Sequence, residues 1–279
     1  MRIAILLLLF SVTSTLQSQE VPHPLTKVDA CKKFSGAVVR IQAGMEGGSG
    51  FVVDPDGWIL TASHVIVDWD TRKYRSPITV VLPDNSTQNA IPVLQIDDIM
   101  FLRDFAILKI AKSELPALPL GDEDTIPVAS DIAIIGFPLS AQGRFQDSVT
   151  TKFCLFGTIA ARQTIPVNKI NIEAIYFQGV SVKGLSGSPL ISLENGEVIG
   201  IANLKLAAIN DQLKAAQATL GAMPDNLRLY IANADYPTTI RNIIHILDRH
   251  LANGLGAATG INDAKYALAK AKRRYKNAK

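Results

Sequence analysis

Apolar side chains occur along most of this chain in short runs that are separated by turn-forming residues. In the first half, these runs lie at 37–42, 51–53, 58–61, 78–82, 91–96 and 105–110. Val, Ile and Thr are frequent in them, which favours strands over helices. The sequence Asp54-Pro55-Asp56-Gly57 separates two of the runs and predicts a β-hairpin.

A second series of runs follows a connection over 115–128 that contains three prolines. These runs lie at 132–136, 149–160, 170–178, 189–193, 197–202 and 229–232. Two strand-rich halves joined in this way predict an all-β fold of two six-stranded antiparallel β-barrels with a C-terminal helix. The first barrel is expected at about 31–120 and the second at about 128–236.

Three segments depart from the strand pattern. Residues 206–220 are rich in Ala, Leu and Gln and predict a helix. Residues 237–251 carry isoleucine and leucine at helical spacing and predict the C-terminal helix of the domain. After it, 252–279 is expected to be a flexible linker followed by a basic helical tail, outside the domain of 31–251.

The N-terminus has the pattern of a secretory signal peptide. Arg2 precedes the apolar run 3–10, and small and polar residues follow as far as Gln19. The apolar run is too short to span a membrane. We therefore expect a signal peptide over 1–18, with Thr15 as an alternative cleavage point, and a secreted or periplasmic protein.

Charge is concentrated at the C-terminal end. The whole chain has a net charge of +3, too small to indicate nucleic-acid binding, so no nucleic-acid partner is expected. Residues 261–279 alone carry seven basic side chains against Asp263, a net charge of +6. This tail could make weak contact with an anionic surface such as lipid headgroups, or it could be a solvated helix. The sequence does not predict the oligomeric state.

Three short motifs supply the parts that acyl transfer by a serine requires, namely a nucleophile, a base and a group that orients the base. His64 follows an apolar run, Asp104 directly precedes another, and Ser186 lies between glycines. Asp97 and Asp98 are rivals of Asp104, but neither directly precedes the apolar run. An α/β-hydrolase is disfavoured, because Ser188 replaces a required glycine and a Ser, Asp, His order is needed. Scattered histidines and distant cysteines predict no metal site, and we expect no cofactor.

At these motifs the chain resembles the trypsin-like serine proteases, and especially the protease domain of the HtrA/Deg family. The resemblance covers about 36–251 and rests on these segments: Gly48-Ser49-Gly50-Phe51-Val52-Val53, Thr61-Ala62-Ser63-His64-Val65, Asp104-Phe105-Ala106-Ile107-Leu108-Lys109, Gly136-Phe137-Pro138, Gly184-Leu185-Ser186-Gly187-Ser188-Pro189-Leu190 and Asn195-Gly196-Glu197-Val198-Ile199-Gly200-Ile201. It implies that Ser186 is the nucleophile, His64 the general base and Asp104 the orienting carboxylate. The backbone N–H groups of Gly184 and Ser186 would form the oxyanion hole.

The resemblance also implies how substrate is bound. Val180 would lie at the base of the primary specificity pocket and favour a small or aliphatic P1 residue. Ile201, Ala202 and Asn203 would line the strand that pairs with the substrate backbone. It further implies a disulfide between Cys31 and Cys154, although two free thiols are the alternative from the sequence alone.

The chain departs from the family in several places. Leu185 replaces the aspartate with which trypsin and its zymogen-activated relatives receive a new N-terminus, so that activation route is not expected. About 25 residues are inserted over 203–229, either as a lid or as a helix packed on the barrel. Too few residues follow position 251 for a PDZ domain. The resulting prediction is a secreted serine endopeptidase acting on protein or peptide substrates, with a catalytically inactive protease-fold binding protein as the alternative.

Overall fold

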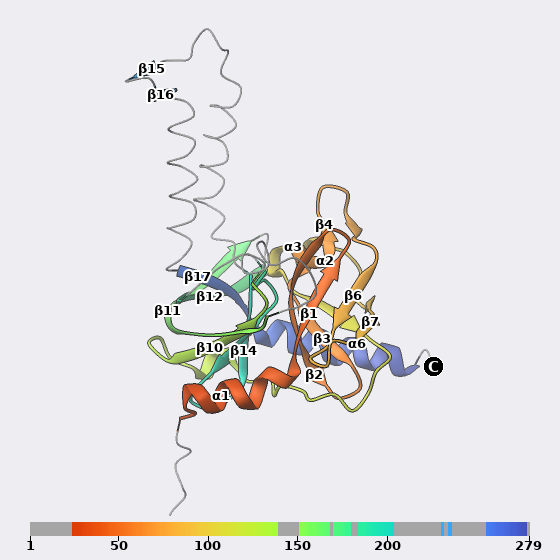
Figure 1. The fold of residues 1–279 in the computed structure, drawn as a ribbon, viewed down its shortest axis with the longest axis horizontal. Coiled ribbons are helices and arrows are strands. Elements are labelled where there is room, and N and C mark those ends of the chain that lie inside the picture. The colour runs from red at the N-terminus through yellow and green to blue at the C-terminus, as the bar shows by residue number, and fades with distance from the viewer. Residues whose placement is uncertain are drawn as a thin grey trace, which may run out of the picture.

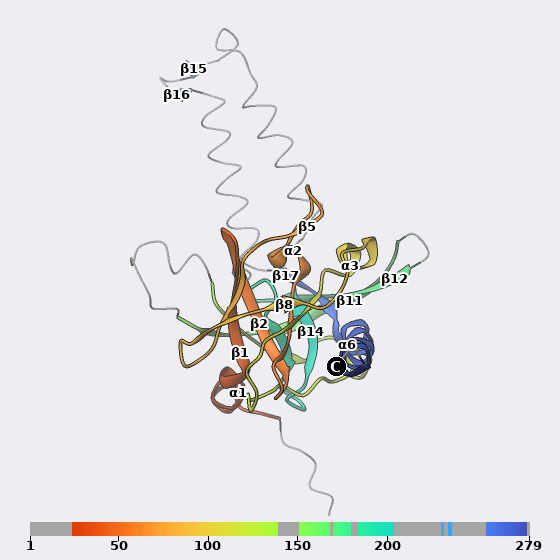
Figure 2. The same ribbon diagram turned by 90° about the vertical axis from the view of Figure 1, so that its right-hand side faces the viewer.

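The computed structural model describes residues 24–138, 151–167, 170–179, 184–203, 230–231, 234–235 and 255–277. Two antiparallel sheets that lie side by side form the body of the fold, as Figures 1 and 2 show. The helix α6 (Ile261–Asn277) runs along both sheets. The predicted signal peptide and the predicted helices at 206–220 and 237–251 lie outside the described residues.

The first sheet has the strand order β7-β6-β1-β2-β3-β9-β8. Its strands are β1 (Val38–Ala43), β2 (Glu46–Asp54), β3 (Trp58–Thr61), β6 (Ile78–Val81), β7 (Thr87–Asn89), β8 (Ile91–Pro92) and β9 (Ala106–Lys109). The two edge strands, β7 and β8, are consecutive in the chain and separated only by Ala90. One bent stretch of chain therefore forms both edges, and the sheet curls into a barrel of six strand positions.

The second sheet is a closed barrel of six strands in the order β10-β11-β12-β17-β14-β13. Its strands are β10 (Asp131–Gly136), β11 (Phe153–Val167), β12 (Ile170–Gln178), β13 (Pro189–Ser192), β14 (Val198–Ala202) and β17 (Leu255–Gly260). The predicted all-β double barrel with a C-terminal helix is thus confirmed.

The sixth strand of the second barrel is β17, which corrects the prediction of a linker over 252–260. The strand pairs with β12 on one side and with β14 on the other. Its sequence is rich in glycine and alanine, which is why it resembles a linker, but small residues are what this position requires. A Cβ added to Gly256 would lie 2.2 Å from the ring of Phe177. The predicted strand at 229–232 is represented by β15 (Tyr230–Ile231), which among the described strands pairs with β16 (Ala234–Asp235) and with neither barrel.

Helix α6 is part of the domain and not a tail outside it, which corrects the second boundary. Ile261, Ala264, Leu268 and Ala271 form a buried stripe along it and join a core cluster with residues of both barrels. Lys272 pairs with Asp54 in the first barrel. The domain therefore extends at least to Asn277, and the helix expected to end it at 251 is not the last one.

Short elements complete the fold. They are α1 (Lys27–Phe34), η1 (Ser35–Ala37), α2 (Ser63–Ile66), β4 (Val67–Asp68), β5 (Lys73–Tyr74), α3 (Asp98–Arg103) and η2 (Glu123–Thr125). The predicted disulfide between Cys31 and Cys154 is present and ties α1 to β11. No helix within the described ranges is long and apolar enough to cross a membrane.

A buried carboxyl group holds the start of α6. The Glu123 carboxylate accepts the Asn262 N–H at 2.8 Å, where the first turn of the helix has free N–H groups. Glu123 is only 3% exposed, and this burial raises the pKa of its carboxyl group. The helix thus begins at the second barrel on a capping acid and ends against the first barrel.

Candidate active site

Asp104 stands at the C-terminal end of α3, directly before the strand β9. Its backbone is left-handed (φ 48°, ψ 43°), a conformation that aspartate adopts more readily than most residues. Its N–H donates to the Met100 carbonyl at 2.9 Å and closes the last turn of the helix. Strained backbone of this kind is concentrated at functional sites, where the surrounding structure holds it in place.

His64 lies in the short helix α2, directly after β3. Its Nδ1 is 2.7 Å from Asp104 Oδ2, and its backbone N–H donates to Asp104 Oδ1 at 3.0 Å. The hydroxyl of Ser63 donates to the same Oδ1 at 2.7 Å. A carboxylate that accepts at Nδ1 keeps the proton of a neutral imidazole on that atom and leaves Nε2 free to take a proton.

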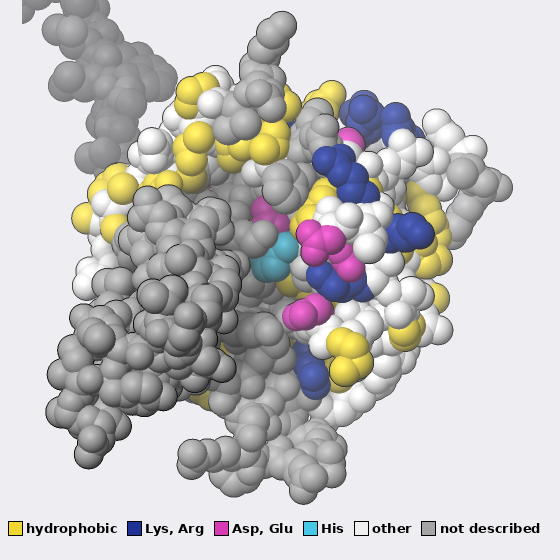
Figure 3. Space-filling model, turned by 90° about the horizontal axis from the view of Figure 1, so that it is seen from above, with side chains coloured by type: hydrophobic (Ala, Val, Ile, Leu, Met, Phe, Trp, Pro, Cys, Tyr) yellow, Lys and Arg dark blue, Asp and Glu magenta, His cyan; other side chains and the backbone are white. Residues whose placement is uncertain are grey.

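The imidazole reaches the molecular surface. The His64 side chain is 21% exposed, and Figure 3 shows it as the cyan side chain of the described residues. Its partner Asp104 is buried, with 12% of the side chain exposed. The pair therefore combines an accessible base with a sheltered carboxylate, as a general base and its orienting group require.

Ser186 lies in a tight turn that leads into β13. Gly184 and Gly187 both have positive φ, at 99° and 85°, and the Ser188 N–H donates to the Leu185 carbonyl at 2.9 Å. A Cβ on Gly187 would lie 2.1 Å from the Ser49 carbonyl oxygen. The turn therefore needs glycine both for its backbone conformation and for its contact with the first barrel.

Ser49 on β2 attaches this turn to the first barrel. Its N–H donates to the Ser186 carbonyl at 2.8 Å, and its hydroxyl donates to the Gly184 carbonyl at 2.8 Å. The same hydroxyl accepts the Phe137 N–H at 2.9 Å. Three groups of the second barrel are thus positioned by a single fully buried serine.

The turn and helix α2 approach each other across Gly48. A Cβ on Gly48 would lie 2.7 Å from Val65 Cγ2 and 2.9 Å from the Ser186 carbonyl oxygen. Val65 directly follows His64, so the backbone of Ser186 lies on the other side of one glycine from the helix that carries the histidine. The first barrel carries His64 and Asp104, and the second carries Ser186.

The structure distinguishes Asp104 from its rivals. Asp97 caps the N-terminus of α3 through the Met100 N–H at 2.7 Å, and Asp98 is the first residue of that helix. Of the three acids, Asp104 is the one bonded to His64. The predicted oxyanion donors, Gly184 and Ser186, lie in the same turn, and their role stays a prediction.

The substrate-binding predictions have mixed outcomes. Val180 lies outside the described residues. Ile201 and Ala202 belong to β14, whose two edges are occupied by β13 and β17, so neither residue can pair with a substrate strand. This corrects both predictions. Asn203 follows the strand, and its N–H donates to the Ala257 carbonyl at 3.0 Å. Its contact with substrate stays a prediction.

Ser49 and Ser63 are positioning residues to which sequence reasoning gave no role. The sequence signals were weak, because Ser49 appeared only as a small residue in a glycine-rich segment and Ser63 as the neighbour of the histidine. Their partners are distant in the chain: Gly184 is 135 residues from Ser49, and Asp104 is 41 residues from Ser63. No local pattern could indicate such pairs.

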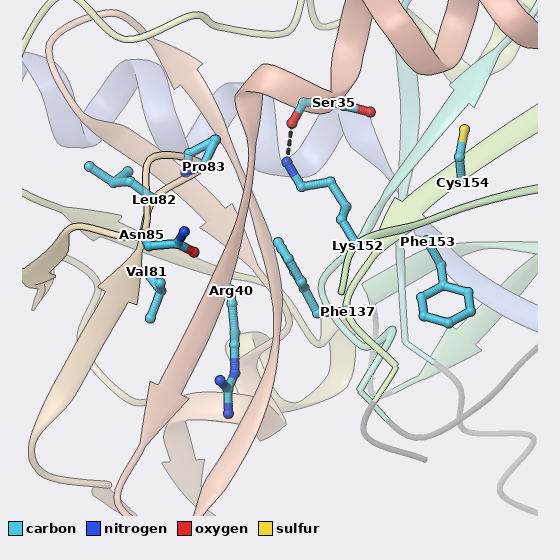
Figure 4. Close-up of a pocket in the computed structure, with 10 residues that line it drawn as sticks. All are labelled: Ser35, Arg40, Val81, Leu82, Pro83, Asn85, Phe137, Lys152, Phe153 and Cys154. Carbon is cyan, nitrogen blue, oxygen red and sulfur yellow. Dashed lines mark hydrogen bonds between the residues drawn. The ribbon is translucent and has the colours of Figure 1, made fainter. Parts of the chain in front are cut away.

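A separate cavity of 410 Å³ lies between the two barrels near the disulfide (Figure 4). Lys152 extends along it, donates to the Ser35 carbonyl and lies 5.5 Å from the centre of the Phe137 ring. Burial lowers the pKa of the Lys152 amine. His64, Asp104 and Ser186 are not among its lining residues, so we do not assign this cavity to the site. Within the described residues, no cluster of three or more metal-binding side chains occurs.

The sequence comparisons match this chain to serine proteases. The family model of the trypsin-like peptidase domain matches residues 48–201. Serine protease HTRA1 of Xenopus tropicalis is 33% identical over 192 residues, which cover 64% of this chain and 38% of that protein. Serine protease HTRA2, mitochondrial, of Bos taurus is 31% identical over 176 residues, which cover 63% of this chain and 34% of that protein. The chain thus spans well under half the length of these relatives.

Solved structures of two proteases are also similar to this chain. An HtrA-type protease with a tripeptide superimposes with a TM-score of 0.51 at 25% identity, covering 64% of this chain and 54% of that one. The serine endoprotease from Yersinia pestis gives a TM-score of 0.54 at 22% identity, covering 90% of this chain and 68% of that one. The second match supports the fold alone.

Proposed function

Because the chain belongs to the trypsin-like peptidase family, we propose that it is a serine endopeptidase that cleaves peptide bonds through Ser186, His64 and Asp104. The observation that carries the proposal is the 2.7 Å hydrogen bond from His64 Nδ1 to Asp104 Oδ2, on a barrel to which the Ser186 turn is attached. An Asp–His pair on one barrel and a glycine-flanked serine attached to that barrel are the parts of an acyl-transfer site.

In this mechanism the Ser186 hydroxyl attacks the scissile carbonyl carbon while His64 Nε2 takes its proton. Asp104 stabilises the imidazolium that forms, and His64 then gives the proton to the leaving amine. Water hydrolyses the resulting acyl-enzyme by the same route in reverse order. The N–H groups of Gly184 and Ser186 donate to the carbonyl oxygen as it becomes negative, and such a donor contributes about 3 kcal/mol to the transition state.

The substrate is a protein or peptide chain, and Val180 favours a small or aliphatic P1 residue. Asn203, the residue that follows β14, is the retained candidate for contact with the substrate backbone. Leu185 is 1% exposed and apolar, so it offers no charge to a newly cut N-terminus. We infer that activity does not depend on such a cleavage, and that the signal peptide at 1–18 directs the enzyme to a secreted or periplasmic location.

Labelling with a fluorophosphonate probe tests the nucleophile. The wild type is expected to be labelled at Ser186, and both Ser186→Ala and His64→Ala are expected to lose the label. Ser188→Ala is a matched control, because Ser188 is a buried serine two residues further on. The assignment of Ser186 is wrong if the wild type is not labelled, or if Ser188→Ala loses the label while Ser186→Ala keeps it.

Cleavage of a peptide library tests specificity separately. We expect peptide products from the wild type, none from Ser186→Ala, and an excess of Val, Ala, Ile or Leu at the P1 position. A preference for Lys or Arg at P1 would overturn the role given to Val180 while leaving the catalytic proposal intact.

A further inference from the structure

A groove of 590 Å³ runs between the helices α3 and α6 on the outside of the first barrel. Met100, Phe105 and Ala271 are among its lining residues and are at most 5% exposed. Val93 and Leu94, which precede the barrel strand β9, add further apolar surface. A groove of this size accommodates a few side chains of a bound segment.

The rim of the groove carries exposed aromatic and basic side chains from α6. Tyr266 is 75% exposed, and Tyr275 is 37% exposed. Lys270 and Arg274 also line the groove and are exposed. These two cations are four residues apart, so they lie on the same face of the helix, one turn from each other.

The two acidic groups of the groove already have partners within the chain. Asp97 accepts the Met100 N–H at 2.7 Å, and Asp263 forms a 2.5 Å ion pair with Arg103. Lys270 and Arg274, by contrast, make no hydrogen bond or ion pair with any residue in the described part of the chain. The lining residues include three basic and two acidic side chains, a net charge of +1, and the basic groups without a partner among the described residues are Lys270 and Arg274, next to apolar surface.

We propose that this groove binds an acidic polypeptide segment that carries apolar side chains. Apolar side chains of the segment lie on Val93 and Leu94, above the buried Met100 and Phe105, and its carboxylates pair with Lys270 and Arg274. Aromatic residues and arginine at the edge of an apolar patch are typical of protein-binding surfaces. A second copy of this chain is disfavoured as the occupant, because its α6 would bring like charges together.

Direct binding to the full-length Ser186→Ala protein tests the proposal. This variant cannot cleave the probe by the proposed mechanism, so the result is independent of the proposed function. The probe is a fluorescein-labelled short peptide in which Glu alternates with Leu and Phe, and its binding is followed by fluorescence anisotropy. A peptide with Lys in place of Glu is the control. Saturable binding of the Glu peptide and none of the Lys peptide is expected.

Two charge reversals on the same helix show where the peptide binds. Lys270→Glu with Arg274→Glu is expected to weaken binding about tenfold or more, since two attractions become repulsions. Arg273→Glu with Lys276→Glu makes the same change of charge at exposed positions that do not line the groove, and it is expected to change binding less than about threefold. Equal losses in both pairs, or no saturable binding of the Glu peptide, would overturn the proposal.

A third variant without a charge reversal keeps the test valid if a charge-reversed pair fails to fold. Tyr266→Ser removes an exposed ring from the rim, so it is not expected to affect folding, and we expect it to weaken the Glu peptide about threefold or more. If neither Tyr266→Ser nor Lys270→Gln with Arg274→Gln changes binding, the groove is not the site. Binding of vesicles with anionic lipids that is lost equally in both charge-reversed pairs would indicate a general anionic surface contact in its place.

Discussion

Replacing Ser49 by alanine removes one of the two Ser49 groups through which the first barrel holds the turn of the proposed nucleophile. The Ser49 hydroxyl donates to the Gly184 carbonyl at 2.8 Å and accepts the Phe137 N–H at 2.9 Å. The Ser49 N–H, which donates to the Ser186 carbonyl, remains in the variant. The substitution therefore frees the Gly184 side of the turn while the Ser186 side stays attached.

The magnitude follows from the two groups that lose their partner. Ser49 is 0% exposed, so water cannot readily replace its hydroxyl. Each buried group left without a hydrogen bond costs about 1–3 kcal/mol, which gives a loss of about 2–4 kcal/mol in the free energy of unfolding after partial relaxation. If the backbone on both sides of Gly184 then shifts, the Gly184 N–H, which is the proposed oxyanion donor, is misplaced. We expect kcat to fall about tenfold to hundredfold, less than for complete loss of a donor.

The assay combines unfolding with kinetics on one preparation. The free energy of unfolding is measured by urea titration, and kcat and KM are measured with a fluorogenic peptide at a temperature where the variant is fully folded. The matched control is Ser192→Ala, in which another fully buried serine on β13 loses one hydrogen bond, from the Glu194 N–H at 3.2 Å. It is expected to lower stability without changing kcat.

A purely structural Ser49 would give a different result. If Ser49→Ala loses stability but keeps the kcat and the fluorophosphonate labelling rate of Ser192→Ala, the hydroxyl does not position the oxyanion donor. A change confined to KM would likewise refute the reasoning, because the proposed oxyanion contact is made in the transition state and not in the bound substrate.

Three further changes test the triad, the helix boundary and the buried acid. Asp104→Asn is expected to lower kcat about 10⁴-fold with little change in KM: Oδ1 accepts from two N–H or O–H groups, so the amide NH₂ faces His64 Nδ1 and selects the wrong tautomer. Leu268→Ala is expected to lower the free energy of unfolding by about 2–4 kcal/mol in urea titration, whereas Arg273→Ala at an exposed position of the same helix changes it by about 0.5 kcal/mol at most. Burial raises the pKa of Glu123, so its contribution to stability is fully present below the pKa of the unfolded chain and is lost as pH rises through the folded pKa. The free energy of unfolding of Glu123→Gln, relative to that of the wild type, is therefore expected to rise between about pH 4 and pH 7. A constant difference between the two proteins over that range contradicts this.

The sequence was sufficient to predict the barrels and the contact between His64 and Asp104. Short β-branched runs between turn residues correspond to the observed strands, because each strand buries at least one face and each turn has a local chemical cause. The hairpin at Gly57 is an example, with φ at 85° where the motif predicted a turn. His64 and Asp104 could be predicted as site residues because each adjoins an apolar strand and therefore lies at an end of the barrel.

The C-terminal boundary could not be predicted from the same pattern. The two neighbouring strands β14 and β17 are separated in the chain by residues 203–254, so their pairing is a long-range contact without a local signal. The apolar side chains at helical spacing over 237–251 also predict a helix, and this helix is then interpreted as the last one of the domain. The sequence does carry one signal for this helix: Ile261, Ala264, Leu268 and Ala271 form an apolar stripe at helical spacing within the basic segment.

Some of the basic side chains of the C-terminal segment hold helix α6 against the rest of the domain. A site divided between two barrels requires that the barrels keep their relative position, and α6 contacts both. Near its start, Lys265 donates to the Gly121 carbonyl at 2.6 Å; near its end, Lys272 pairs with Asp54 and Tyr275 meets Trp58 with ring centres 5.5 Å apart. Two of the seven cations are therefore used inside the fold, and of the remaining five, Lys270 and Arg274 line the groove.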